Sequence, residues 1–275
     1  MNKPDDSITR AFIGHAMKVH SSIGPGMNEE LYHHELVRRL VESGIEHLSK
    51  PRRDLVYRGV VADTFEPDLV VAGHFIPELK CLRGKFASAH LVQLFCYCKF
   101  WRLRTGLLMD FGKGSLIWKR YLYFSKTAPW PEVSLPAFVT NPGLARDIHR
   151  LVGESLAEVG LGYRETTCNG LVAAALQAGG LHVVRNPTAQ VLRFGPMGMP
   201  CIMVENTCAI LVTALCEEIT AADRAILQTH LRWLNLDWGI NLHFGKSTVD
   251  VRFASRPKTK AEPPADSGKP TDHAL

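Results

Sequence analysis

The chain has 275 residues, 46% of them hydrophobic, which is enough apolar material for one large globular domain or two small ones. No stretch approaches the roughly 18 consecutive apolar residues of a membrane-spanning helix, and residues 1–10 lack the basic and apolar segments of a secretory signal. The seven cysteines are an odd number outside an export context, which argues against a disulfide framework. We therefore expect a cytoplasmic protein with reduced thiols and no membrane partner.

The first part of the chain carries signals for three helices and five strands. Apolar spacing predicts a helix over residues 8–20, which the Gly-Pro-Gly run at 24–26 ends. Asn28 is a good N-cap for a second helix that reaches Ser43, and its predicted buried face comprises Leu31, Tyr32, Leu36, Val37, Leu40 and Val41. The segments that follow predict strands at 55–57, 69–71 and 74–79, a helix at 87–101, and strands at 105–109 and 115–123.

A proline-rich stretch divides the chain. Four prolines between residues 127 and 143 exclude a continuous helix and favour an extended connector. We place a first domain at residues 1–125, a linker at 126–145 and a second domain at 146–255. Residues 256–275 contain almost no large apolar side chain, which predicts a disordered tail.

The second domain repeats the element order of the first. Helical patterns at 145–159 and 169–178 precede strands at 201–204 and 209–215, a helix from Thr220 to about residue 235, and strands at 240–244 and 248–253. Two anchors align the halves: residues 24–29 (GPGMNE) with 160–165 (GLGYRE), and residues 111–113 with 244–246, both Phe-Gly-Lys. Matches this short can arise by chance, yet their similar offsets and the shared order favour a tandem duplication.

Positive charge belongs to the first domain. Residues 1–125 contain 18 Lys and Arg against 13 Asp and Glu, whereas residues 146–255 contain 9 against 10. Such an excess is suited to neutralising phosphates and speeding the encounter with nucleic acid. An ordinary solvated surface explains the same composition equally well, so charge alone leaves both interpretations open.

Three charged residues are the candidates for chemistry. Asp68 ends one strand-like stretch, and Glu78 and Lys80 lie on the next strand with the period-two spacing that points both side chains to one face. Two carboxylates on neighbouring hairpin strands suit Mg²⁺ or Mn²⁺, which would activate water, with Lys80 orienting or helping to deprotonate it. Apolar neighbours argue that these charges have a partner or a role. On these residues alone, however, a turn aspartate beside a solvated Glu-x-Lys pair remains the commoner explanation.

One family accounts for these features together. Residues 24–32, GPGMNEELY, resemble the motif that names the GxxExxY proteins, a branch of the PD-(D/E)XK nuclease superfamily. The resemblance continues in the family's order through Pro67 to Val71, Glu78 to Lys80, His90, Gln93 to Tyr97 and Leu107 to Gly112, and so covers residues 12–121. It implies an α/β restriction-endonuclease-like core, a mixed four-stranded sheet flanked by helices, which the repeat would duplicate in tandem.

The resemblance also assigns roles to the charged residues. It implies that Asp68 and Glu78 are ligands of Mg²⁺ or Mn²⁺, that Lys80 lies beside the attacking water, and that Glu29 approaches the metal as a third acidic group. Nucleic acid is the implied partner, with DNA favoured over RNA.

Three residues of the predicted third helix complete the candidate site. Gln93 and Tyr97 resemble the Gln-x-x-x-Tyr motif of RecB-like nucleases, in which the polar pair faces the substrate, and their i, i+4 spacing puts them on one helix face. A surface glutamine and a core tyrosine are the alternatives. His90 is kept as a substrate contact, although a histidine in an apolar helix is more often a structural core residue.

The second domain lacks this chemistry. Aligned on the Gly-x-Gly anchor, Glu165 matches Glu29, but Cys168, Val204, Ala214 and Cys216 stand opposite Tyr32, Asp68, Glu78 and Lys80. A small shift offers Glu205 for the aspartate and restores no Glu-x-Lys. We interpret residues 146–255 as a degenerate, inactive copy with a structural or regulatory role, which packs on, dimerises with or positions the first domain. The pairing would be an intramolecular pseudo-dimer or a homodimer.

Two functions are therefore compared. The leading hypothesis is a divalent-metal-dependent nuclease that hydrolyses phosphodiester bonds of DNA or RNA. The alternative is a non-catalytic nucleic-acid-binding or protein-interaction module that retains the nuclease fold. It is favoured by the inactive copy, by the modest net charge of +5, and by Pro77, which removes a ladder donor within a core strand. The complete set of Glu29, Asp68, Glu78 and Lys80 argues against it.

Overall fold

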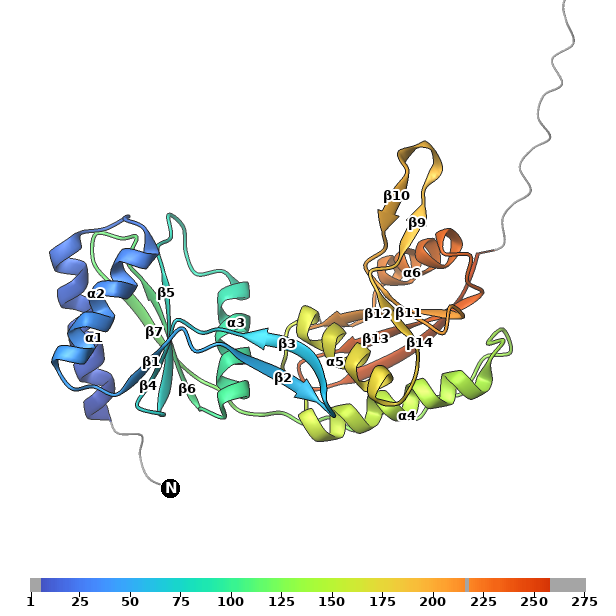
Figure 1. Ribbon diagram of the computed structural model, residues 1–275, viewed down its shortest axis with the longest axis horizontal. Coiled ribbons are helices and arrows are strands. Elements are labelled where there is room, and N and C mark those ends of the chain that lie inside the picture. Colours follow the sequence, from blue (N-terminus) through green and yellow to red (C-terminus); the bar gives the residue numbers. More distant parts are fainter. Residues whose placement is uncertain (1–5, 216–217, 258–275) are drawn as a thin grey trace, which may run out of the picture.

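The computed structural model describes residues 6–215 and 218–257, which form two five-stranded sheets lying side by side in an elongated molecule, and two two-stranded hairpins (Figure 1). Most of the predicted tail, from residue 258 on, lies outside the described residues. Each five-stranded sheet has helices on both faces. No helix in the described ranges is long and apolar enough to cross a membrane.

The first sheet has the strand order β1-β4-β5-β6-β7, in which only β5 and β6 run parallel. Its strands are β1 (His47–Ser49), β4 (Leu69–Val71), β5 (Phe75–Lys80), β6 (Thr105–Asp110) and β7 (Ile117–Leu122). The mixed α/β class is confirmed, but the predicted number of four strands is wrong. The fifth strand is β1, which carries one large apolar residue and was invisible to hydrophobic patterning.

Helices α1 (Asp6–Ile23) and α2 (Glu29–Glu42) cover one face of this sheet, and α3 (Ser88–Trp101) covers the other. The predicted start of α2 is confirmed, because the Asn28 side chain accepts a hydrogen bond from the backbone N–H of Glu30. Its buried face is narrower than predicted. Leu31 and Val41 are 46% and 66% exposed, whereas His33 is buried. A histidine takes this place because its ring finds hydrogen-bond partners on β1 and before β4.

The second sheet repeats the first strand for strand. Its order is β8-β11-β12-β13-β14, again with one parallel pair, β12 and β13. The strands are β8 (Val183–Arg185), β11 (Ile202–Val204), β12 (Cys208–Ala214), β13 (Trp238–Phe244) and β14 (Val249–Ser255). Helices α4 (Pro142–Val159) and α5 (Glu165–Ala178) cover one face, and α6 (Ala221–Trp233) covers the other. This equal topology supports the predicted tandem repeat.

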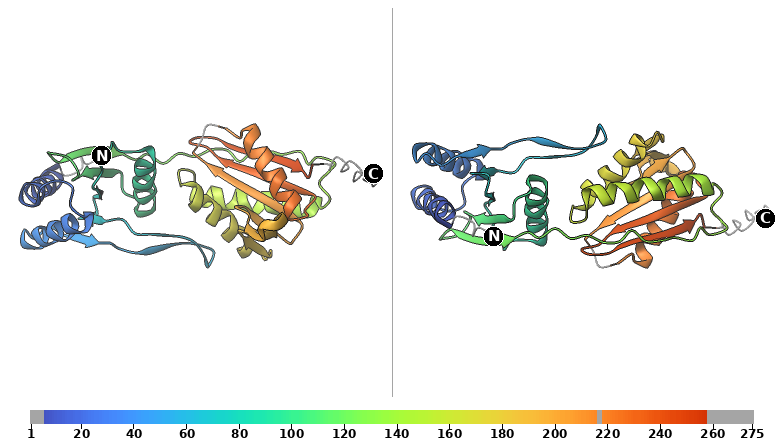
Figure 2. Two further views of the ribbon diagram at one scale, coloured as in Figure 1. Left: turned by 90° about the horizontal axis from the view of Figure 1, so that it is seen from above. Right: turned by 90° about the horizontal axis from the view of Figure 1, so that it is seen from below.

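Each half also inserts a hairpin between its first and second sheet strands. In the first half β2 (Arg53–Tyr57) pairs with β3 (Val60–Phe65), and the two-residue turn between them has positive φ at both Arg58 and Gly59. In the second half β9 (Thr188–Gln190) and β10 (Pro196–Gly198) flank a 3-10 turn, η1 (Leu192–Phe194). The two hairpins differ in surroundings. The β2–β3 hairpin extends from the first half to α5 of the second half, whereas the β9–β10 hairpin projects from the body (Figures 1 and 2).

The β2–β3 hairpin packs on α5 and joins the two halves. Residues Tyr57, Ala62 and Phe65 share one hydrophobic cluster with Cys168, Leu171 and Val172. At its rim the Asp63 carboxylate accepts hydrogen bonds from Thr167 and Arg164. Helix α3 adds a second contact, in which the Lys99 ammonium lies 4.4 Å from the centre of the Tyr163 ring. The two halves are therefore packed together rather than merely tethered.

The proline-rich segment between the sheets is held against α4. Trp130 covers Gly153, where an added Cβ would lie 2.8 Å from the indole nitrogen, and that nitrogen donates to His149 at 3.3 Å. The other ring nitrogen of His149 contacts the carbonyl oxygen of Pro131 at 2.9 Å. The predicted absence of a continuous helix before Pro142 is confirmed over residues 123–141.

Candidate active site

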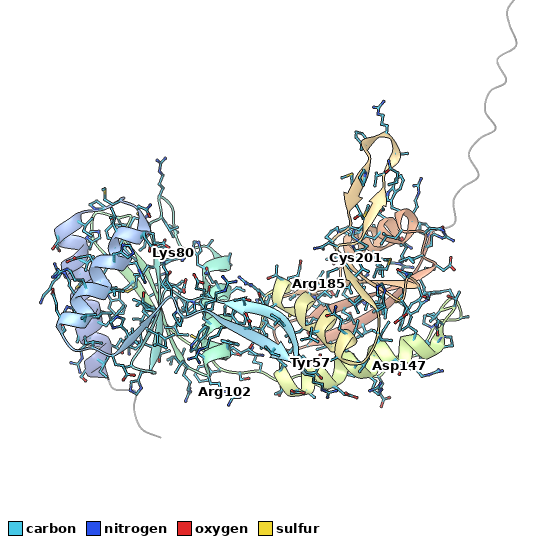
Figure 3. The ribbon with its side chains drawn as sticks, viewed as in Figure 1. Tyr57, Lys80, Arg102, Asp147, Arg185 and Cys201 are labelled. Carbon is cyan, nitrogen blue, oxygen red and sulfur yellow. The ribbon has the colours of Figure 1, made fainter. Side chains whose placement is uncertain are left out.

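The candidate site lies where β5 ends, beside the residue that precedes β4, and Figure 3 labels Lys80 at this edge of the sheet. The backbone N–H of Asp68 donates to Oε1 of Glu78 at 3.2 Å, and the Asp68 carboxylate accepts from the backbone N–H of Leu79 at 2.7 Å. The Lys80 ammonium lies 3.3 Å from Oε2 of Glu78. The three predicted residues are thus brought together by an antiparallel turn and by period-two spacing.

Glu78 is unusual because it is a carboxyl group in the core of the domain. The residue is only 1% exposed, and burial raises its pKa to about 8, with the neighbouring negative charge of Asp68 adding to the shift. The ammonium of Lys80 acts in the opposite direction and does not cancel these effects. A buried carboxyl with a strongly raised pKa in a charged cluster is typical of functional sites.

Lys80 is the cation at the centre of the cluster. Burial alone would lower its pKa, but the carboxylates of Glu78, Asp68 and Glu29 outweigh that effect, so the pKa is raised. Its ammonium therefore stays charged at neutral pH. It is held by Glu78 and, at 3.9 Å, by Glu29.

Glu29 comes to this point because of the loop that precedes it. Gly24 and Gly26 have φ values of +83° and +81°, a region that favours glycine. Tyr32 then secures the loop, since its hydroxyl donates to the Gly24 carbonyl at 2.6 Å and accepts from the backbone N–H of Met27 at 3.0 Å. In the first turn of α2, Glu29 faces Lys80, and burial raises its pKa. The glycines and the tyrosine of the motif are thus a frame that positions its glutamate.

Pro77 does not interrupt the ladder that holds the site. The backbone N–H of Leu79, two residues on, points toward Asp68, so the nitrogen of Pro77 faces the same side, toward β4. On that side the β4–β5 register has only the pair Val71 and Phe75, while the parallel register with β6 runs unbroken from Phe75 to Lys80. The proline lies where β4 and β5 have already diverged, which leaves space for the Asp68 and Glu78 side chains.

Gln93 and Tyr97 form one polar unit on α3. The Gln93 amide donates to the Tyr97 hydroxyl at 3.1 Å, and that hydroxyl donates to the carbonyl oxygen of Glu66 at 3.1 Å. Since Glu66 stands two residues before Asp68, this chain of bonds links the helix to the aspartate. Tyr97 is buried, as the core alternative anticipated, yet its hydroxyl reaches the backbone beside the site.

His90 is occupied at the start of α3. Its Nδ1 accepts from the backbone N–H of Ala87 at 3.1 Å and so caps the helix, while its ring lies edge-on to Phe86. These contacts give the residue a structural role, and the structure brings it to a helix terminus rather than into the Asp68, Glu78 and Lys80 cluster.

Asp110 is a site neighbour that patterning overlooked. It ends β6 opposite Lys80 and is 2% exposed. Its Oδ1 accepts from the backbone N–H groups of Leu82 and Gly112, each at 2.9 Å, and Lys113 lies 3.5 Å from its other oxygen. Asp110 thereby holds the segment that follows Lys80. The sequence signal that could have identified Asp110 is an isolated aspartate at the end of a buried strand.

The donor set fits a hard divalent cation. Asp68 and Glu78 are neighbours, Lys80 contacts both Glu78 and Glu29, and the negative charge of Asp68 contributes to the raised pKa values of Glu78 and Glu29. Mg²⁺ and Mn²⁺ are held in proteins by one or two carboxylates together with water. An ion here would offset a repulsion that Lys80 offsets only in part.

The second half has other residue types at the matching positions. Aligning the sheets by strand register puts Cys201, Leu211 and Thr213 opposite Asp68, Glu78 and Lys80. This differs by three residues from the alignment on the Gly-x-Gly anchor, which is therefore wrong at these positions. The two alignments differ because the segment that contains the hairpin is shorter in the second half. There, 16 residues separate β8 from β11, whereas 19 residues separate β1 from β4 in the first half. Under either alignment the Asp and Glu-x-Lys set is missing.

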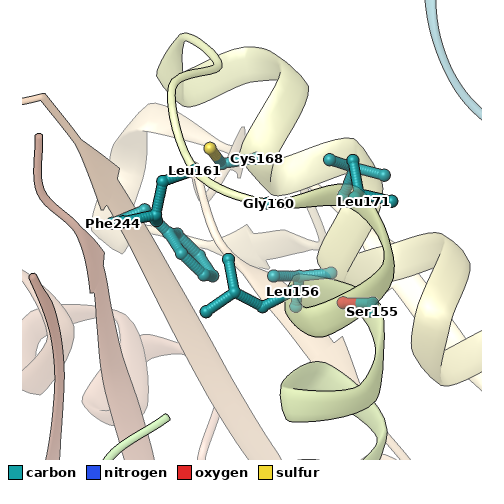
Figure 4. A pocket seen from close by; sticks show the side chains of 9 residues that line it. Ser155, Leu156, Gly160, Leu161, Cys168, Leu171 and Phe244 are labelled. Carbon is teal, nitrogen blue, oxygen red and sulfur yellow. The ribbon is translucent and has the colours of Figure 1, made fainter. Parts of the chain in front are cut away.

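A pocket in the second half offers no replacement for this chemistry. It lies between α4, α5 and β13, holds about 20 Å³, and has Ser155 as its polar residue among apolar neighbours such as Leu156 and Phe244 (Figure 4). A cavity of this size admits about one water molecule.

Comparison with protein families covers the first half. Residues 6–121 match the family model of the PD-(D/E)XK nuclease superfamily. These residues are similar to members of that superfamily. Its members are generally nucleases and typically use divalent metals. No match was found among curated proteins or among solved structures.

The architecture of the first half is consistent with this similarity. Its mixed sheet is flanked by helices, and the acidic cluster lies at the end of the parallel pair β5 and β6. The sequences Pro67-Asp68 and Glu78-Leu79-Lys80 match the letter pattern in the superfamily name.

Proposed function

We propose that the protein is a divalent-metal-dependent nuclease that hydrolyses phosphodiester bonds of DNA or RNA, with its active site in the first half. The observation that carries this proposal is the cluster of Asp68, Glu78 and Lys80 at the end of β5, with a Glu78 carboxyl that is 1% exposed. A protein that used these charges only for folding would gain little from burying them, because replacing a buried ion pair by apolar residues is often neutral or stabilising.

Each residue has a distinct part in the proposed reaction. Asp68 and Glu78 would hold Mg²⁺ or Mn²⁺, with Glu29 as the third acidic group. The ion would supply Lewis acidity that activates water and stabilises charge on the phosphate. Lys80 would orient the attacking water by hydrogen bonding. Hydrolysis adds this water across one P–O bond, so its oxygen joins phosphorus and the leaving oxygen receives a proton.

The surrounding residues define the rest of the proposal. Gln93 and Tyr97 would contact the substrate or hold the Asp68 segment, and the basic excess of residues 1–125 would attract nucleic acid, with DNA favoured. The chain would divide into domains 1–125 and 146–255 joined by residues 126–145, with the first in the GxxExxY branch and the second an inactive copy arising by duplication.

The test is a cleavage assay on the full chain. Purified protein is incubated with single- and double-stranded DNA and RNA in Mg²⁺ or Mn²⁺, beside Asp68→Asn and Lys80→Met. Lys18→Ala is the matched control, because Lys18 is an exposed cation on α1. We expect cleavage by the wild type and the control, loss on adding EDTA, and a decrease of at least about 100-fold in both site variants.

Three results would contradict the proposal: equal cleavage by wild type and site variants, cleavage that EDTA leaves unchanged, or no cleavage of any substrate. Binding without cleavage would support the non-catalytic alternative. In that case affinity should fall as salt rises, since phosphate contacts release counterions.

A further inference from the structure

Helix α2 carries a second cluster of potential metal ligands on the face next to that of Glu29. Glu30, His33 and His34 each offer one ligand atom, and these atoms lie within 4.8 Å of one another. The spacing i, i+3 and i+4 places the three side chains on neighbouring positions of the helix surface. Glu29 turns toward Lys80, whereas Glu30 pairs with Lys50, so adjacent glutamates serve different clusters.

His33 is the residue that points to a ligand. It is 3% exposed, and its Nε2 lies 3.1 Å from the carbonyl oxygen of Asp68 and 3.3 Å from the Ser49 hydroxyl. Its Nδ1 is also buried and has no hydrogen-bond partner among the described residues. When Nε2 carries the proton and donates it to the Asp68 carbonyl, Nδ1 keeps its lone pair. Metal-bound histidines are typically oriented in this way, with the second nitrogen bonded to a carbonyl or carboxylate.

We propose that Glu30, His33 and His34 form a second metal site that binds Zn²⁺ or a transition metal of similar chemistry. Two imidazoles and one carboxylate are a ligand set of this class, whereas Mg²⁺ prefers oxygen ligands. The set leaves the fourth position of a tetrahedral ion to water, and His34, 70% exposed, opens the site to solvent. An exchangeable ion is therefore expected rather than one required for folding.

Without a metal ion, the ammonium group of Lys50 supplies the positive charge beside the Glu30 carboxylate. This ammonium contacts Glu30, and His34 lies 3.0 Å from the other oxygen of that carboxylate. The Lys50 side chain is 37% exposed and belongs to a segment outside the helix, so it can leave as an ion enters. Metal and ammonium would compete for the same carboxylate, which gives the proposal a variant predicted to bind more tightly than the wild type.

The site is linked to the candidate active site through Asp68. Its backbone carbonyl contacts His33, and its side chain lies beside Glu78 and Leu79. Because the ring of His33 would be fixed by an ion on its other nitrogen, occupancy would stiffen the segment that carries Asp68. The ion would thus influence the cluster of Asp68, Glu78 and Lys80 by fixing the position of Asp68, and not by contacting the substrate.

The experiment measures binding and needs no nuclease activity. The full chain carrying Asp68→Asn and Glu78→Gln, which removes oxygen ligands of the first cluster, is titrated with Zn²⁺ by calorimetry. It is then titrated with Co²⁺, whose visible absorption reports nitrogen coordination. We expect one ion per chain, at least about tenfold weaker binding after adding His34→Ala, and tighter binding after adding Lys50→Ala. His74→Ala, at an exposed histidine outside the cluster, should leave the affinity unchanged.

The second metal site is excluded if His34→Ala binds both ions as tightly as its parent, or if His74→Ala weakens binding by the same factor. Zn²⁺ binding without the Co²⁺ absorption of nitrogen ligands would also contradict it. A nuclease assay that fails would not affect this result, because the readouts are affinity and spectrum.

Discussion

The Cα of Gly170 lies so close to the carbonyl oxygen of Ala62 that a Cβ added at the glycine would be 1.9 Å from that oxygen. Gly170 belongs to α5 of the second half, and Ala62 belongs to β3 of the hairpin that leaves the first half. Both partners of the contact are backbone, so neither can move aside by changing a rotamer. The absence of one side chain thus permits the contact by which the two halves pack.

Gly170→Ala should therefore loosen the junction between the halves. The added methyl group must push β3 off α5, and overpacking of this kind costs about 1–3 kcal/mol. We expect a lower Tm and faster proteolysis within residues 53–65, measured by calorimetry and limited digestion. The contrast is Gly14→Ala on α1, where a Cβ meets nothing within 4 Å. That change should stabilise the helix by about 0.5–1 kcal/mol. Equal effects at both glycines would contradict the role of the close contact.

Glu78→Gln should remove activity and yet raise stability in alkaline solution. The folded-state pKa of Glu78 is about 8 and its ordinary value is 4.5, so between these values the folded state binds more protons than the unfolded state. The stabilising contribution of Glu78 is therefore lost as pH rises from about 4.5 to about 8. Glutamine has no such titration. Without added metal, we expect the Tm of the variant to be a few degrees higher than that of the wild type at pH 8. At pH 5 the two Tm values should be closer to each other.

The control for this comparison is Glu46→Gln, at an exposed carboxylate before β1. Its melting curve should follow the wild type at both pH values. A Tm difference between Glu78→Gln and wild type that does not increase from pH 5 to pH 8, or an equal gain in the control, would show that Glu78 is not the titrating group.

Mg²⁺ should stabilise the protein more at pH 8.5 than at pH 6. Binding requires the carboxylate form of Glu78, and protons compete with the metal as long as pH is below the pKa of about 8. The increase of Tm with Mg²⁺ concentration measures the affinity at each pH. In Glu78→Gln the pH dependence should vanish along with most of the shift. A shift that is independent of pH in the wild type would place the ion elsewhere.

Tyr97→Phe should reduce the rate of cleavage more than it reduces stability. The lost hydroxyl donates to the Glu66 carbonyl, two residues before Asp68, and accepts from Gln93. Removing one such bond destabilises a protein by about 1 kcal/mol, whereas misplacing a ligand segment lowers activity by about 10–100-fold. Single-turnover rates at saturating substrate separate positioning from binding. A lower affinity for substrate with an unchanged rate would assign Tyr97 to substrate contact instead.

Thr213→Val tests the inactive second copy. Thr213 stands in β12 where the first half has Lys80, and its hydroxyl contacts Nδ1 of His243 at 2.9 Å. Valine preserves the shape of threonine and removes the hydroxyl, so the cleavage rate should stay within about twofold of wild type. A large loss of activity with a normal Tm would overturn the view that only the first half is catalytic.

Local signals were sufficient for the helices and for the strands of the inner sheet. The caps at Asn28 and Thr220 and the long apolar periods predicted α2, α6 and the other helices to within a few residues, because caps and periodicity act over one or two turns. The short edge strands β1 and β8 were missed, as were β3 and the β9–β10 hairpin. Such strands owe their existence to a neighbour's backbone, which no local pattern records.

The alignment between the halves failed for a similar reason. Both anchors were real, but the first has an offset of 136 residues and the second an offset of 133. Only the strand register shows that the hairpin inserted between them is three residues shorter in the second half.

The sequence by itself determined which residues could carry the chemistry, since Asp68, Glu78 and Lys80 are specified by their types, their period-two spacing and the family motif around them. Only the tertiary structure decided their environment. The burial that raises the pKa of Glu78, the divergence of β4 and β5 at Pro77, and the bond from Tyr97 to Glu66 all arise from elements far apart in the chain. Residue type limits what a side chain can do, while its solvation and its partners depend on what the rest of the fold packs around it.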